Sequence, residues 1–136
     1  MANRKSWLEK LNDKKEPQLK RIEIQFADMP AGSNMFIATP QLIDEYVKQI
    51  GFGRRIDIKT LRKDLALAHH ADYTCPVTTG IFLRIVAEAN YEKLQSGKEI
   101  DEISPFWRVI TPNSPLAKKL TFGQEFLIQQ INKEEK

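Results

Sequence analysis

The chain contains few side chains of the types that carry out covalent or metal chemistry. Its one cysteine, Cys75, precedes Pro76 at the expected start of a helix, a position that can lower the pKa of a thiol. No histidine or acid is placed beside Cys75 by its spacing, so a buried small side chain or a sulfur cap to the helix is favoured. His69 and His70 are adjacent, and a helix cannot direct adjacent side chains at one metal ion. We therefore expect no catalytic residue, no metal site and no cofactor.

Basic side chains are the second group with functional potential. The chain of 136 residues carries 21 Lys and Arg against 18 Asp and Glu, a net charge of +3. Residues 1–21 hold seven basic and three acidic side chains (net +4), whereas residues 22–136 hold 14 and 15 (net −1). A second cluster comprises Arg54, Arg55, Lys59, Arg62 and Lys63. Such a distribution is found in nucleic-acid-binding proteins and also on ordinary solvated surfaces.

The elements that would position these side chains are mainly helices. Thr39-Pro40 is expected to open one helix, ended by the glycines at 51 and 53, and Asp57 to cap a second over 58–69. Pro76 is expected to start a third helix that runs to about Leu94. In the second helix the inward-facing residues are predicted to be Leu61, Leu65 and Ala68.

Shorter elements are expected on either side of these helices. A capping box at Ser6 predicts a short helix to about residue 12, residues 14–20 are expected to form a linker, and alternation predicts strands over 21–26 and 35–38. Residues 71–74 are expected to form a turn, residues 105–110 a short strand or turn packed by aromatic side chains, and residues 124–132 a last helix. We therefore expect a mostly α protein with short strands (α+β), with a basic arm over 1–38 and a winged helix-turn-helix over 39–136.

Several segments resemble the DNA-binding domain of alkylguanine-DNA alkyltransferases, the methylated-DNA-protein-cysteine methyltransferase family. Residues 53–61 (GRRIDIKTL) resemble the segment that opens the helix-turn-helix of that family, and residues 77–83 (VTTGIFL) fall on its recognition helix. Residues 105–110 (PFWRVI) fall on the active-site motif Pro-Cys-His-Arg-Val-Ile/Val. Residues 71–80 (ADYTCPVTTG) also resemble small prokaryotic alkyltransferase-like proteins. The resemblance covers residues 40–131 in element order and implies a DNA-binding winged helix.

The chain departs from this family at the positions that carry its chemistry. The family's acceptor cysteine and activating histidine are replaced by Phe106 and Trp107, which can neither accept an alkyl group nor move a proton. The resemblance therefore implies a protein that is not an enzyme, like the alkyltransferase-like proteins that bind alkylated DNA without repairing it. The family's inserted arginine falls near Val77 or Thr78 and a family tyrosine falls on Ile58, so the base-flipping apparatus is incomplete.

The resemblance and the basic cluster together imply a set of DNA-contacting side chains. These are Arg54, Arg55, Lys59, Arg62, Thr78, Thr79, Arg84 and Arg108, and the equivalents of the lesion pocket are Pro105, Phe106 and Trp107. For Arg108, a phosphate or pocket contact and a half-buried structural arginine bonded to loop carbonyls are both open. Thr78 and Thr79 would contact phosphates or bases, or simply pack. Phe106 and Trp107 fit a core or pocket wall better than a base-stacking platform.

Two functions of different classes follow from the sequence. The first is a monomeric, non-enzymatic protein that binds double-stranded DNA, with alkylated DNA and a repair protein as candidate partners. The second is a winged-helix interaction or regulatory domain that does not bind DNA. A third, weaker hypothesis is alkyl transfer to Cys75. No apolar run approaches the roughly 18–20 residues of a membrane span, and no signal peptide is visible, so we expect a cytoplasmic protein without a membrane partner.

Overall fold

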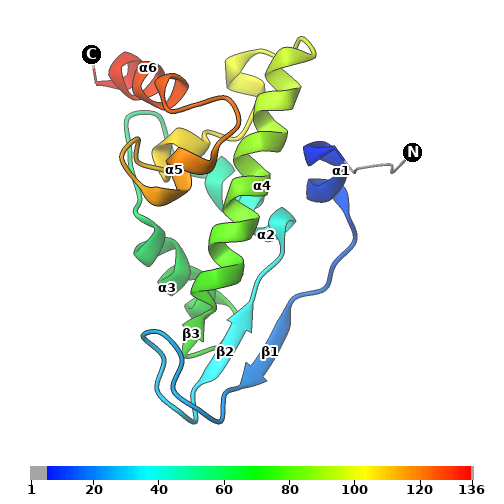
Figure 1. The fold of residues 1–136 in the computed structure, drawn as a ribbon, viewed down its shortest axis with the longest axis vertical. Coiled ribbons are helices and arrows are strands. Elements are labelled where there is room, and N and C mark those ends of the chain that lie inside the picture. Colours follow the sequence, from blue (N-terminus) through cyan, green and yellow to red (C-terminus); the bar gives the residue numbers. More distant parts are fainter. Residues whose placement is uncertain (1–5, 136) are drawn as a thin grey trace.

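The computed structural model describes residues 6–135 as a mixed α+β fold, mostly helical with one small sheet. Its elements are α1 (Trp7–Asn12), β1 (Gln18–Arg21), β2 (Asn34–Ile37), α2 (Pro40–Lys48), α3 (Ile58–Ala68), β3 (Tyr73–Thr74), α4 (Pro76–Gln95), η1 (Ile100–Glu102), η2 (Phe106–Arg108), α5 (Pro115–Lys119) and α6 (Glu125–Glu134). The 20-residue α4 runs through the middle of the molecule, with α1 and α5 on opposite sides of it in Figure 1.

The three strands form one sheet in the order β1-β2-β3 at one end of the molecule (Figure 1). β1 is antiparallel to β2, with Leu19 opposite Phe36, and β2 is parallel to the two-residue β3, with Phe36 opposite Thr74. Because β3 leads directly into α4, the sheet fixes the position at which α4 begins.

The starts of α2, α3 and α4 confirm the helix boundaries expected from the sequence. Thr39 accepts a hydrogen bond from Leu42 N at 3.2 Å, and Asp57 accepts one from Thr60 N at 2.7 Å. A side-chain oxygen at this position satisfies one of the backbone donors that a helix start leaves open. Pro76 is the first residue of α4, where its missing N–H costs nothing.

The core lies around α4, which packs against α1, α2, η2 and α5. Two buried carboxylates connect α4 to its neighbours by hydrogen bonds. Asp44 of α2 accepts from Asn90 Nδ2 at 3.0 Å and from Ser104 Oγ at 2.6 Å. Glu88 of α4 accepts from Thr121 N at 2.8 Å. These bonds satisfy polar groups that would otherwise be costly to bury.

Several expected short elements are displaced or different in kind. The strand predicted over 21–26 is wrong: β1 ends at Arg21, and residues 22–33 form a loop closed by the bond from Ile22 N to Ser33 O at 2.9 Å. Part of the predicted linker 14–20 belongs to β1, and residues 73–74 of the predicted turn pair as β3. Of the strand or turn expected over residues 105–110, the structure has the turn, because Val109 N and Ile110 N both bond back to Phe106 O in the 3₁₀ turn η2.

The inward face of α3 was also predicted incorrectly at one position. Leu61 and Leu65 are buried as expected, but Ala66 is buried in place of Ala68, which is exposed. α5 was not predicted, although Ser114 caps it by accepting from Ala117 N at 3.1 Å. Residues 1–5 of the arm expected over 1–38 lie outside the described residues, and the rest of it packs on the remainder of the chain through α1 against α4 and β2 against β3. None of the helices in the described range has the length and apolar character that a membrane crossing requires.

Candidate nucleic-acid interface

α3 and α4 are joined by a short connection over residues 69–75. α3 ends where His69 N bonds to Leu65 O, and His70 then adopts a left-handed backbone with φ of 57°. That conformation is uncommon outside glycine and turns the chain sharply away from the helix axis. Asp72 accepts from Asn34 N at 2.8 Å and ties the turn to β2. The connection holds β3, which leads into α4, against the middle of α3, where Thr74 and Arg62 exchange hydrogen bonds.

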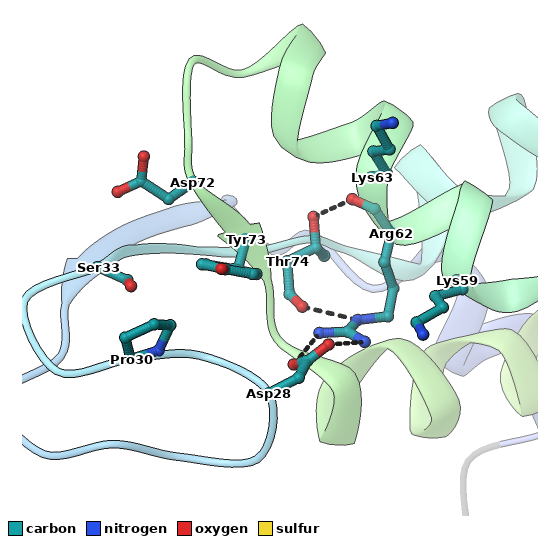
Figure 2. A pocket seen from close by; sticks show the side chains of 9 residues that line it. All are labelled: Asp28, Pro30, Ser33, Lys59, Arg62, Lys63, Asp72, Tyr73 and Thr74. Carbon is teal, nitrogen blue, oxygen red and sulfur yellow. Dashed lines mark hydrogen bonds and ion pairs between the residues drawn. The ribbon is translucent and has the colours of Figure 1, made fainter.

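A cavity of about 550 Å³ lies between α3, β3 and the 22–33 loop (Figure 2). Its charged lining comprises three cations and two carboxylates. The residues that line it are Asp28, Pro30, Ser33, Lys59, Arg62, Lys63, Asp72, Tyr73 and Thr74. The cavity thus shares three cations, Lys59, Arg62 and Lys63, with the second basic cluster.

The side chain of Arg62 lines the bottom of this cavity and is mostly buried. Its Nε donates to Thr74 O at 2.9 Å, while Nη1 and Nη2 donate to Asp28 at 3.1 and 2.8 Å. Thr74 Oγ1 donates in return to Arg62 O at 2.7 Å. Hydrogen bonding from Arg62 lowers the pKa of the Asp28 carboxyl. The guanidinium is therefore already engaged in holding the 22–33 loop against α3, and Asp28 is a partner that sequence reasoning did not identify.

Four cations of the second basic cluster remain available to an external anion. Arg54, Arg55, Lys59 and Lys63 are exposed, and no hydrogen bond or ion pair joins their side chains to the part of the chain described here. Lys59 and Lys63 are four residues apart, hence one turn apart on α3. Figure 2 shows the ammonium of Lys59 beside the Arg62 pair and that of Lys63 directed away from it.

Acidic side chains near these cations are largely occupied by internal bonds. Asp57 caps α3, and the backbone hydrogen bond from Thr60 lowers the pKa of its carboxyl. Asp64 accepts from Tyr46 Oη at 2.6 Å on the side of α3 that faces α2. The stretch from residue 54 to residue 63 holds five cations against Asp57 alone, a net charge of +4, and therefore presents a cationic surface.

The first turn of α4 holds the two threonines expected to contact DNA. Thr79 is 1% exposed, and its hydroxyl donates to Cys75 O at 2.6 Å, so it packs inside the protein. Thr78 is half-buried, and its hydroxyl oxygen has no partner. Cys75 is buried as expected, but its sulfur makes no cap to the helix. The outward side of this turn is formed by Val77 and, one turn further, Ile81, which are 53% and 54% exposed.

Arg84 and Arg108 lie apart from the cations of α3 and have partners of their own. Arg84 lies 3.6 Å from Glu88, with its guanidinium 5.1 Å from the ring centroid of Trp7. Arg108 Nη1 donates to Ile50 O at 2.6 Å, and its Nε and Nη2 donate to Glu134 at 2.8–3.0 Å. These contacts match the structural role considered for Arg108, which bonds a loop carbonyl and joins α6 to η2.

The three residues aligned with the lesion pocket are all buried. Phe106 is fully buried and lies 5.7 Å, centroid to centroid, from both Phe122 and Phe126. Trp107 Nε1 donates to Glu134 at 2.6 Å, and Pro105 is buried beside it. This segment therefore forms core and anchors α6. Within residues 6–135 no group of three or more His, Cys, Asp or Glu is arranged to hold a metal ion.

Comparison with known proteins gave no significant match to a family model, a curated protein or a solved structure. A function for this chain therefore has to be argued from its own residues and their arrangement.

Proposed function

We propose that this protein binds double-stranded DNA without chemical turnover, as a member of the alkyltransferase-like type with a winged helix-turn-helix arrangement. α3 and α4 would form the helix pair, and the cations before and along α3 would face the duplex. The segment from Pro112 to Gly123, which contains α5, would take the place of the wing.

The observation that carries this proposal is the group of four exposed, unpaired cations beside the helix pair. Arg54 and Arg55 precede α3, and Lys59 and Lys63 lie along it. Each cation that neutralises a phosphate releases a condensed counterion, which supplies most of the affinity in sequence-independent binding. Arg62 would add little to this surface, because Asp28 occupies its guanidinium and balances its charge.

Alkyl transfer has no support from the side chains of the aligned motif. The acceptor position is Phe106, which is a fully buried hydrocarbon ring. Trp107 stands where the activating base would be, and its one polar hydrogen is donated to Glu134. The aligned motif therefore supplies no group for alkyl transfer, and the activity proposed here is binding through other residues.

The proposal is tested by fluorescence anisotropy with matched duplexes, with and without an alkylated guanine, at two salt concentrations. We expect the slope of log K against log salt to fall by about 0.9 for each phosphate contact removed. Lys59→Ala/Lys63→Ala should therefore weaken binding to every sequence and flatten the salt dependence. Arg54→Ala/Arg55→Ala should do the same.

The matched control is Lys93→Ala/Lys98→Ala, which removes the same charge in the last turn of α4 and just beyond its end. If the control weakens binding as much as the α3 double variant, net charge rather than this surface is responsible. If the wild-type chain fails to bind at low salt, the proposal is wrong. Tighter binding to the alkylated duplex would identify a damage sensor, and equal binding a general DNA-binding protein.

A further inference from the structure

A groove of about 600 Å³ crosses the exposed side of α4, well separated in its lining from the cations of α3. The floor is an apolar stripe of α4 made by Val77, Ile81 and Ile85, which are spaced four residues apart and so share one helix face. Trp7 of α1 and Leu116 of α5 form its two walls. The groove therefore lies between the helices that flank α4 in Figure 1.

Gly80 makes the groove deeper at its centre. A Cβ atom at this position would meet nothing within 4 Å, so packing within the described chain does not require a glycine there. Glycine inside a helix costs about 1 kcal/mol relative to alanine. Open space of this kind lets another chain approach the backbone of α4 closely.

Every charged side chain that lines the groove is a cation. These are Lys10 on α1, Arg84 on α4 and Lys119 on α5. Lys10 Nζ lies 4.2 Å and Arg84 Cζ 5.1 Å from the centroid of the Trp7 ring, so two of the cations stand at that wall. Glu88 partly neutralises Arg84 from outside the lining, and Lys119 stands on the opposite wall.

We propose that this groove binds an acidic amphipathic helix of a partner protein. The apolar stripe from Val77 to Ile85 rises about 12 Å along α4. A partner helix with apolar side chains at i, i+4 and i+7 spreads them over about 10 Å, which fits this stripe. Carboxylates flanking the apolar face of that helix would meet the cations on both walls. A duplex fits this surface less well, because its floor is hydrocarbon rather than hydrogen-bonding groups.

The two tryptophans of the chain provide a local readout. Trp7 lines the groove and is half-buried, whereas Trp107 is buried beneath Glu134. With both labelled as 5-fluorotryptophan, the full chain gives one fluorine resonance for each. The probe is a designed peptide of about 18 residues, with Leu at i, i+4 and i+7 of each repeat and Glu on the flanks. Addition of this peptide should shift the Trp7 resonance and leave that of Trp107 unchanged.

Three variants separate binding in the groove from effects on folding. Ile81→Glu should lower the affinity for the peptide at least about ten-fold. Ile24→Glu, at a residue 79% exposed on the 22–33 loop, should change that affinity by less than about two-fold. Lys119→Glu should weaken it about three- to ten-fold through charge reversal. Gly80→Ala should raise the melting temperature, because alanine favours the helix, and should still lower the affinity for the peptide. Misfolding cannot produce that combination.

Other occupants of the groove would overturn the proposal in recognisable ways. Equal binding of a scrambled peptide, or of one with Lys in place of Glu, would show that no acidic amphipathic helix is recognised. A Trp7 shift caused by duplex DNA, lost in Ile81→Glu, would assign the groove to the DNA surface. A Trp7 shift with protein concentration alone, together with dimer sedimentation, would make the groove a contact between copies.

Discussion

The carboxylate of Glu134 and the guanidinium of Arg108 form a bidentate ion pair, with Nη2 to Oε2 at 2.8 Å and Nε 3.0 Å from both oxygens. Glu134 lies in the last turn of α6, and it also accepts from Trp107 Nε1 and from Gly53 N. Both side chains of the pair are about nine-tenths buried. One carboxylate thus ties α6 to η2 and to the turn that leads into α3.

Glu134→Gln should therefore destabilise the fold. The substitution removes the charge that accepts the arginine fork and turns an amide N–H₂ toward donors. Loss of hydrogen bonds to a charged group costs about 1.5–3 kcal/mol, which is the expected fall in the free energy of unfolding in urea. Glu135→Gln, at the exposed neighbouring residue, should change the free energy of unfolding by less than about 0.5 kcal/mol. Equal effects of the two substitutions would contradict the role assigned to Glu134.

The same ion pair makes stability depend on pH. Burial alone would raise the pKa of Glu134, but the hydrogen bonds from Arg108, Trp107 and Gly53 outweigh it, and the folded-state pKa lies below the ordinary value of 4.5. The stabilisation is therefore fully present above 4.5 and is lost as the pH falls through the folded-state pKa. Urea unfolding at about pH 7 and about pH 3 should show a larger loss for wild type than for Glu134→Gln. Parallel losses would mean that other carboxyls, such as Asp28, dominate.

The long helices could be predicted because their starts are encoded by single residues. Thr39, Asp57 and Pro76 act on backbone donors within three or four positions of themselves, so the local sequence contains the cause. α5 carries the same local signal in Ser114 and Pro115, but with five residues it lacks the periodic apolar face that distinguishes a helix from a broken loop.

The wrongly predicted strand and the unpredicted partner of Arg62 both depend on contacts between residues that are distant in the sequence. Residues 22–26 alternate like a strand, but Ile22 bonds to Ser33 across a loop and leaves Ile24 exposed. The basic cluster could be predicted from sequence as a group. That Arg62 is occupied by Asp28, 34 residues earlier, could not, because no local pattern reports which loop folds onto α3.

Asp28→Asn should tighten DNA binding if the α3 surface is the contact. The substitution frees the Arg62 guanidinium and removes a negative charge beside Lys59, so we expect roughly two- to five-fold higher affinity at low salt. Because Asp28 is 46% exposed, the stability change should stay below about 1 kcal/mol. Anisotropy with the unmodified duplex measures the affinity, and urea unfolding measures the stability. Asp101→Asn, in exposed η1, removes the same charge elsewhere and should leave affinity nearly unchanged.

Phe106→Cys should not create an alkyl acceptor, although it restores the thiol of the aligned motif. The side chain at this position is fully buried among Phe122, Phe126 and Trp107, and no base stands beside it. The lost ring should cost about 2–4 kcal/mol of stability. Intact-mass spectrometry after incubation with alkylated DNA should show no added alkyl group at position 106. A mass gain there would show that the buried motif opens to DNA.

Cys75 should be unreactive in the folded chain. Its side chain is 6% exposed and packs with Met29 and Met35, while its backbone is held by the bond from its N to Phe36 O at 2.8 Å. An aromatic disulfide reagent should react at least about 100-fold more slowly with the native chain than with the urea-unfolded chain. If the chain binds DNA as proposed, Cys75→Ala should leave the affinity unchanged, because the buried sulfur contributes packing alone. Rapid reaction in the native state, or an alkyl mass gain confined to Cys75 after incubation with alkylated DNA, would instead make this thiol an acceptor.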